Sequence, residues 1–268
     1  MKKLIPLLLL SLTWTSLAQP PDSPVRVVMN GFVANNVIAG SVTAIATKSD
    51  ILSLETTGFA NLEKKTTMPP DALFWIASMT KPMAAVCVLQ LQEAGKLSIE
   101  DPVEKHLPEF AGQWMVEARA KGKLTLKKPA RAITIRDLLT HTSGLPNTNS
   151  PRPESTLAEL VMSYSKTPLQ FEPGDRWSYS NAGINTLGRI VEVVSRTPFA
   201  DYLQTHVLDP CGMKDTTFWP SPAQAKRIAS SYRPDSNGKL QPVDVYFLKG
   251  GLSNRKRTPS PAGGLYAT

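Results

Sequence analysis

The stretch FWIASMTKPMAAVCVLQLQEAGK, residues 74–96, places a serine and a lysine directly before a long apolar run. Residues 83–91 are apolar nearly all round, a pattern that predicts a helix buried in the core. Gly95 is expected to end this helix, since glycine readily adopts the left-handed conformation found just past helix ends. Ser78 and Lys81 therefore stand where a buried helix begins, which raises the question of what they do there.

Ser78 and Lys81 have the spacing of a nucleophile and its base, because residues three apart share a helix face. At a helix N-terminus the Ser78 N–H lacks an intrahelical acceptor and can bind an oxyanion. An unperturbed lysine, with a pKa of about 10.4, is protonated at neutral pH, and desolvation against Phe74 and Trp75 would lower that pKa. The stretch alone leaves two interpretations open: a catalytic pair, or a structural serine beside a surface lysine.

The S-x-x-K spacing by itself is weak evidence for catalysis, because it recurs elsewhere in the chain. None of the other three matches opens an expected buried helix, so each is explained without a function. These matches are Ser163–Lys166, Ser236–Lys239 and Ser253–Lys256.

A second stretch, EPGDRWSYSNAGINTLG (residues 172–188), places a phenol and an amide before another expected helix. Tyr179 and Asn181 are two positions apart, so in an extended segment their side chains point the same way. Aimed into one cleft, they could move a proton and hold a substrate carbonyl. The alternative is a core tyrosine beside an asparagine that caps the helix. For His141, in the motif HTSGL, packing within a loop is the favoured interpretation.

The patterns on either side of these stretches predict an α+β fold, with an antiparallel sheet, flanking helices and a helical region. A helix should start at Ser23–Pro24, and two runs rich in β-formers, residues 40–47 and 51–60, predict an antiparallel hairpin. A helical region is expected from about residue 78 to residue 206, followed after Trp219 by a poorly patterned tail. Its expected helix caps are Asp101–Pro102, the pair Thr134 and Asp137, and the pair Thr156 and Glu159.

The final residues, SPAGGLYAT (260–268), hold a turn at Pro261–Gly264, then two apolar residues, then Thr268, where a helix N-cap would stand. A two-stranded hairpin does not form a stable sheet by itself. We therefore expect the sheet of this chain to be incomplete, with further strands belonging after Thr268.

The N-terminus has the pattern of a secretory signal. Lys2 and Lys3 precede a short apolar segment, and residues 16–18 supply the small side chains of a cleavage site. Residues 1–18 are therefore expected to be removed, leaving an exported protein, periplasmic or secreted, with no stable membrane insertion. A retained N-terminal anchor is the alternative.

Composition narrows the class of protein and its partners. The chain has 268 residues, of which 41% are hydrophobic, as in globular proteins. Its formal charge of +8 gathers at residues 121–131 and 254–257, which we interpret as solvated loops, so no nucleic-acid partner is expected. Cys87 falls in the apolar helix, and it is expected not to pair with Cys211. With three histidines and no H-E-x-x-H or C-x-x-C motif, neither a metal nor another cofactor is expected.

The motif SMTK followed by YSN resembles the first two motifs of the serine β-lactamase and penicillin-binding-protein superfamily. The tyrosine of the second motif resembles that of class C β-lactamases, D-aminopeptidases and family VIII carboxylesterases. The stretches GKLSIEDPVEKHLPEF, TIRDLLTHTSGL and NAGINTLGRIVEVVS are also similar to this family, in the same order. The likeness runs from about Val25 to Thr268, and the joint match is specific where each motif alone is not.

This resemblance implies a sheet with flanking helices packed against a helical region, with the active site between them. Ser78 would form an acyl-enzyme, Lys81 and Tyr179 would share the proton transfers, and Asn181 would hold the substrate. The domain would span residues 19–268, in three parts: an α/β part (19–80), a mainly helical part (81–218) and an irregular return toward the sheet (219–268).

The implied function is that of an exported serine hydrolase acting on an ester, a β-lactam or a D-amino-acid peptide. In the family a third motif, of K-T-G or H-x-G type, lies well after the AGGL region, on a sheet strand that also supplies an oxyanion donor. The chain is therefore expected to be C-terminally incomplete and to lack that motif. The alternative is a non-catalytic remnant that binds peptidoglycan or β-lactams. The sequence does not indicate an oligomeric state.

Overall fold

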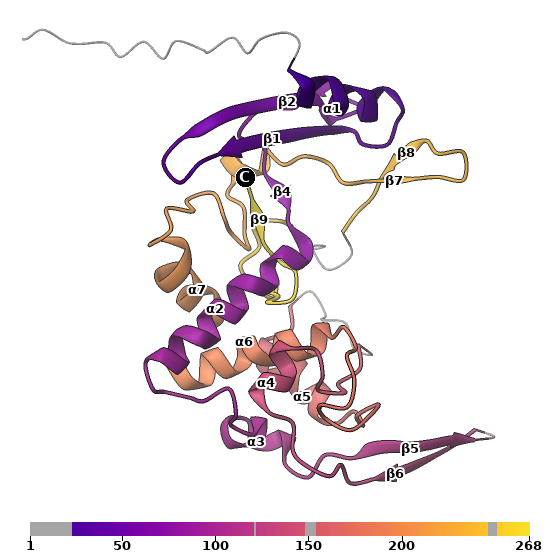
Figure 1. The fold of residues 1–268 in the computed structure, drawn as a ribbon, viewed down its shortest axis with the longest axis vertical. Coiled ribbons are helices and arrows are strands. Elements are labelled where there is room, and N and C mark those ends of the chain that lie inside the picture. The colour runs from indigo at the N-terminus through magenta and orange to yellow at the C-terminus, as the bar shows by residue number, and fades with distance from the viewer. Residues whose placement is uncertain (1–22, 121, 148–153, 246–250) are drawn as a thin grey trace, which may run out of the picture.

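The computed structural model describes residues 23–120, 122–147, 154–245 and 251–268 (Figure 1). The expected signal, residues 1–18, lies outside the described residues. Within these ranges, no helix is both long enough and apolar enough to cross a bilayer.

The N-terminal layer is a small antiparallel sheet with one helix beside it (Figure 1). Its elements are α1 (Pro24–Ala34), β1 (Gly40–Ala46), β2 (Ile51–Asn61) and β3 (Thr66–Thr67). The strand order is β1-β2-β3, and Gly40 of β1 lies opposite Gly58 of β2. The predicted hairpin is therefore confirmed, with one added short strand.

The start of α1 is held to the sheet by polar contacts. α1 begins at Pro24, as expected, but the Ser23 side chain does not cap it. The Ser23 hydroxyl hydrogen-bonds the buried carboxylate of Glu55 on β2 instead, and Arg26 lies 3.7 Å from the same carboxylate. The expected cap is therefore replaced by a contact between helix and sheet, in which the Ser23 side chain is directed at a charged and therefore strong acceptor.

The helical region surrounds α6, which packs against α2, α4, α5 and α7 (Figure 1). Its elements are η1 (Ala77–Met79), α2 (Thr80–Glu93), α3 (Val103–His106), η2 (Pro108–Phe110), α4 (Ile135–Leu139), α5 (Leu157–Ser165), α6 (Asn181–Ser195), α7 (Phe199–Leu203) and η3 (Gln204–Leu208, a π-helical turn). The main hydrophobic core lies among these helices, where Val88, Leu187, Ile190 and Leu203 are fully buried.

The burial of α2 differs in part from the prediction. Cys87, Val88 and Leu91 are buried against the core, but Val86 and Leu89 are each 41% exposed. The expectation of burial all round was therefore wrong for one face. In this structure α6, α7 and η3 contact α2, and the two exposed residues, three positions apart, lie together on one face of the helix.

The predicted helix caps have mixed outcomes. Thr134 with Asp137, and Thr156 with Glu159, both form complete capping boxes, so these predictions are confirmed. The expected cap at Asp101 is wrong, because Pro102 occupies the N-cap position of α3 without a side-chain bond. The Asp101 carboxylate instead accepts the Ser98 N–H and pairs with Lys105 and His106.

A β-ribbon interrupts the region that was expected to be helical. β5 (Met115–Ala120) and β6 (Lys123–Lys127) form an antiparallel hairpin that projects away from the helices (Figure 1). The side chains of β6 are exposed, so this part of the 121–131 run is solvated, but it is a strand and not a loop. The alternation in KLTLK is a strand signal that the high charge of the segment obscured.

The tail after Trp219 contains more regular structure than its composition suggested. Its elements are α8 (Pro222–Ala225), β7 (Tyr232–Pro234), β8 (Leu240–Pro242) and β9 (Tyr266–Ala267). β9 pairs antiparallel with β4 (Phe74–Trp75), with Phe74 opposite Ala267. The chain thus returns to the strand that leads into Ser78, and the turn before β9 comes to lie beside the start of α2 (Figure 1).

Candidate active site

Ser78 lies in η1, the short helical turn between β4 and α2. Ala77, just before it, has φ +47°, in the left-handed region that non-glycine residues adopt rarely and with strain. Ile76 donates its N–H to the Leu265 carbonyl at 3.0 Å, which ties the turn to the C-terminal strand. Ser78 itself is exposed and stands ahead of the first turn of α2.

Lys81 is buried next to Ser78. Only 7% of the residue is exposed, and its Nζ donates to Ser78 Oγ at 2.9 Å and to the Ala262 carbonyl at 2.5 Å. In the described parts of the chain, no carboxylate lies within ion-pair distance of this Nζ. The amine therefore lies between two neutral oxygen atoms, one of which is Ser78 Oγ.

Tyr179 completes the cluster from the segment that precedes α6. Its hydroxyl donates to Ser78 Oγ at 2.7 Å, and Lys81 Nζ lies 4.7 Å from the centre of its ring. Burial raises the pKa of Tyr179, but the hydrogen bonds with Lys81 and Ser78 and the charge of Lys81 outweigh it and hold the pKa below its usual value. Ser78 Oγ thus accepts hydrogen bonds from both Lys81 and Tyr179.

Asn181 is placed differently from the expectation. α6 begins at Asn181, so the segment from Tyr179 is not extended throughout, and the helix N-cap is Ser180, whose Oγ accepts the Gly183 N–H at 3.0 Å. The side chain of Asn181 is exposed, and its backbone N–H donates to Asn147 Oδ1 at 2.7 Å. Its contact with substrate stays a prediction.

His141 packs within a loop, as expected, and its contacts are with the segment that carries Tyr179. Its ring packs on Tyr179, with 4.7 Å between ring centres and 33° between planes. Its Nδ1 accepts the Ser180 N–H at 3.1 Å, and its carbonyl accepts the Ser178 N–H at 2.8 Å. The sequence held one signal of this role, since HTSGL follows a helix cap and precedes the YSN stretch, but nothing local showed that the two would meet.

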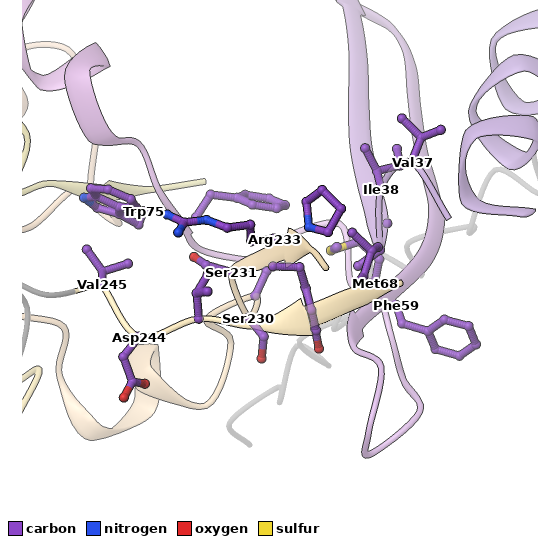
Figure 2. Close-up of a pocket in the computed structure, with 18 residues that line it drawn as sticks. Val37, Ile38, Phe59, Met68, Trp75, Ser230, Ser231, Arg233, Asp244 and Val245 are labelled. Atoms are coloured by element: carbon purple, nitrogen blue, oxygen red, sulfur yellow. The ribbon is translucent and has the colours of Figure 1, made fainter. Parts of the chain in front are cut away.

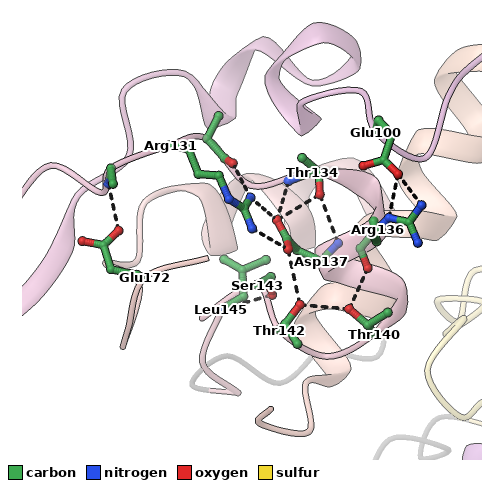
Figure 3. A network of polar contacts seen from close by, with 12 residues as sticks. Glu100, Arg131, Thr134, Arg136, Asp137, Thr140, Thr142, Ser143, Leu145 and Glu172 are labelled. Carbon is green, nitrogen blue, oxygen red and sulfur yellow. Dashed lines mark hydrogen bonds and ion pairs between the residues drawn. The ribbon is translucent and has the colours of Figure 1, made fainter. Parts of the chain in front are cut away.

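The turn that carries His141 is fixed by a buried network around Asp137 (Figure 3). Asp137 accepts hydrogen bonds from both terminal nitrogens of Arg131 and from the backbone and hydroxyl of Thr134. The hydroxyl of Thr142, directly after His141, also donates to Asp137, at 3.3 Å. Burial raises the pKa of Asp137, but these bonds outweigh it and keep the carboxyl ionised. The ionised Asp137 carboxylate, through these hydrogen bonds, therefore fixes the position of the turn that holds His141.

The turn at residues 260–263 is held against α6 and supplies the second acceptor of Lys81. Asn185 is buried, and its Oδ1 accepts the Ala262 N–H at 3.1 Å. One turn further along α6, Gly188 faces Pro261: a Cβ added to Gly188 would lie 2.3 Å from Pro261 Cγ. Because Gly188 has no side chain, the turn can approach α6 closely enough for the Ala262 carbonyl to accept a hydrogen bond from Lys81 Nζ.

Gly188→Ala is expected to lower the free energy of unfolding by about 1–3 kcal/mol, because the added methyl group forces Pro261 to move. Gly183→Ala is a matched control in the same helix, since its Cβ would meet its nearest neighbour at an ordinary 3.5 Å. This control is expected to be neutral or stabilising by about 0.4–1 kcal/mol. Urea unfolding measures both, and equal stability of the two variants would contradict the argument.

A separate cavity of about 710 Å³ lies between the start of β1, β4 and the β7–β8 ribbon (Figure 2). Its lining includes Trp75, and its charged members are Arg233 and Asp244. Ser78, Lys81 and Tyr179 do not line it. This cavity is therefore separate from the candidate nucleophile. We assign the candidate active site to the polar cluster of Ser78, Lys81 and Tyr179.

Metal-binding side chains and cysteine thiols are two other kinds of group that could take part in chemistry. Within the described ranges, no three His, Cys, Asp or Glu side chains are grouped so that they could hold a metal ion. Cys87 is buried and Cys211 is exposed, and both are free thiols. Burial raises the pKa of the Cys87 thiol to about 12, so this group is not an activated nucleophile.

Comparison with known proteins finds a matching family model and several similar proteins. The family model described as Beta-lactamase matches residues 25–268. Protein Rv1367c of Mycobacterium tuberculosis is 35% identical over 221 residues, covering 76% of this chain and 54% of the relative. Esterase EstB of Burkholderia gladioli is 32% identical over 222 residues, covering 77% of this chain and 52% of the relative. The chain thus spans about half the length of these curated relatives.

Among solved structures, EstCE1, described as a hydrolase with promiscuous acyltransferase activity, superimposes with a TM-score of 0.75. The match covers 91% of this chain and 68% of that one, at 24% sequence identity. At this identity the likeness concerns the fold alone. It confirms the predicted α+β fold with helices and antiparallel strands.

Proposed function

Because the chain belongs to the Beta-lactamase family, we propose that it is a serine hydrolase that forms an acyl-enzyme on Ser78. One observation carries the proposal: Ser78 Oγ lies within hydrogen-bond distance of both Lys81 Nζ and the Tyr179 hydroxyl. An exposed hydroxyl between a buried amine and a phenol of lowered pKa is the arrangement that activates a nucleophile. Lys81 and Tyr179 are the proposed proton-transfer groups.

In the proposed acylation, Ser78 Oγ bonds to the substrate carbonyl carbon while its proton passes to whichever of the two groups is deprotonated, a neutral Lys81 amine or a Tyr179 phenolate. The Ser78 N–H donates to no backbone acceptor among the described residues, and it can stabilise the oxyanion that develops. As the tetrahedral intermediate collapses, the bond to the leaving group breaks and the leaving group takes that proton. Water then attacks the acyl carbon and gives a proton to the same pair; the bond to Ser78 Oγ breaks, Oγ takes that proton back, and the acid product leaves.

The proposed substrates are an ester, a β-lactam or a D-amino-acid peptide, since each presents an acyl carbon to a nucleophilic serine. Met79, beside the nucleophile, is 69% exposed, and Trp177, whose ring centre is 6.3 Å from that of Tyr179, is 64% exposed. These apolar surfaces favour a substrate with an apolar portion. We also propose that the protein is exported, on the pattern of its first 18 residues.

Active-site labelling tests this proposal directly. The chain is incubated with a fluorophosphonate, a penicillin and a p-nitrophenyl ester, and the adduct is located by intact mass and peptide mapping. We expect one adduct per chain, on Ser78, with at least one of the three reagents. Absence of any adduct, or an adduct on another serine such as Ser143, would contradict the assignment. Reversible penicillin binding without an adduct would favour the alternative of a non-catalytic binder.

A further inference from the structure

We propose that His141 is a positioning residue whose neutral imidazole holds Tyr179 against Ser78 and releases it when the ring gains a proton. This inference rests on the proposed function, because it concerns the alignment of that cluster. Loop packing was the favoured interpretation of His141, and the acyl-transfer steps proposed above do not use it. Its contacts with three consecutive residues of the 178–180 segment give it a more specific role.

His141 contacts Tyr179 and the residues on both sides of it. The His141 carbonyl accepts the N–H of Ser178, and its Nδ1 accepts the N–H of Ser180. The ring lies against the Tyr179 ring itself, 4.7 Å away between centres. The residues before and after Tyr179 are thus fixed by one side chain and its own backbone, and the phenol has little freedom to turn away from Ser78.

These hydrogen bonds determine the protonation state of the ring. Because Nδ1 accepts a hydrogen bond, it carries no proton, and the neutral ring holds its proton on Nε2. A second proton would have to be added at Nδ1, directly opposite the Ser180 N–H. Two donors would then face each other at 3.1 Å, and the contact that fixes Ser180 would be lost.

The surroundings favour the neutral ring. The charged and titratable groups that face His141 are Lys81 on α2 and Tyr179 ahead of α6. On its own side, Asp137 of α4 is already saturated by Arg131 and Thr134. Burial, followed by the charge of Lys81, lowers the pKa of His141 below its usual value of about 6.5. The ring is therefore neutral at pH 7, and the cluster is expected to lose alignment in a more acidic range.

The backbone at His141 supplies a well-matched test variant. His141 has φ +60°, a conformation that asparagine tolerates better than most residues. In His141→Asn, the amide Oδ1 takes the place of Nδ1 and can accept the Ser180 N–H, but it cannot be protonated. In His141→Phe the ring is kept and the acceptor is lost. The two variants separate hydrogen bonding from packing.

The experiment compares pH profiles of kcat and KM for an activated ester from pH 4 to pH 9. We expect His141→Asn to lose less kcat at pH 7.5 than His141→Phe, because it keeps an acceptor for the Ser180 N–H, and we expect its kcat to fall less than the native kcat as the pH is lowered. We expect His141→Phe to lose about 10- to 100-fold in kcat at every pH with little change in KM, since small misplacements of catalytic groups have effects of this size. His206→Asn is the control, because His206 stacks on Tyr202 at 4.0 Å, outside the Ser78 cluster.

A profile of His141→Asn that superimposes on the native profile would overturn the role of protonation. Native activity in His141→Phe would overturn the positioning role. Imidazole ¹⁵N spectra give a readout that does not need turnover: His141, assigned by the signal missing in His141→Asn, should show the proton on Nε2 and should titrate with a pKa below its usual value of about 6.5. If Ser78 is not labelled, the proposed function fails while this measurement still tests the state of His141.

Discussion

Ser78→Ala is expected to lower turnover of an activated ester by about 10⁴-fold or more and to abolish the covalent adduct. The variant removes the one oxygen that both Lys81 and Tyr179 contact, so neither proton acceptor has a nucleophile left to activate. Because Ser78 is exposed, the change leaves no cavity in the core. Steady-state kinetics and intact mass spectrometry measure the loss, and an unchanged melting temperature shows that the fold is intact.

Ser163→Ala is the matched control for that experiment, since Ser163 and Lys166 have the same S-x-x-K spacing. Ser163 lies on α5, where its hydroxyl donates to the Leu160 carbonyl at 2.6 Å, away from the Ser78 cluster. We expect native turnover in this variant. If Ser78→Ala kept native turnover, or if Ser163→Ala lost it, the nucleophile would have to be reassigned.

Lys81→Met is expected to slow acylation by about 10²- to 10⁴-fold, the range that a positioned general base contributes. Methionine fills nearly the same volume as the buried lysine stem, so packing between α2 and the 260–263 turn should persist. The variant loses the donor to Ser78 Oγ and the charge that holds the pKa of Tyr179 down. Stopped-flow acylation with a fluorescent β-lactam or an activated ester measures the rate of the chemical step.

The comparison for Lys81→Met is Lys166→Met, at the exposed lysine of the second S-x-x-K match. This change should leave acylation unaltered. Acylation of Lys81→Met within a few-fold of the native rate would contradict the role of Lys81 and would leave Tyr179 as the base. A fall in the melting temperature as large as that of a core truncation would indicate that the lysine acts through stability instead.

Much of the local structure could be predicted from the sequence. The hairpin at Gly40–Asn61 and the capping boxes at Thr134 and Thr156 follow from β-propensity and from side-chain hydrogen bonds spanning three residues. The two missed helix caps have a shared cause. Ser23 and Asp101 bond to partners other than their own helix ends, and such competition between partners is invisible in a local pattern.

The candidate site, too, was predictable from the sequence only in part. The sequence alone indicated that Ser78 and Lys81 are neighbours, because a spacing of three residues brings two side chains together in a helical turn. It could not distinguish this pair from the other S-x-x-K matches. Only the tertiary structure decided that Tyr179, 101 positions away, and Ala262, 181 positions from Lys81, close around the pair. Those contacts depend on how whole helices pack around α6, where a residue as remote as Gly188 sets the distance to the 260–263 turn. Spacings and caps act over a few residues, whereas a catalytic cluster of this kind is assembled from faces that meet only in the folded chain.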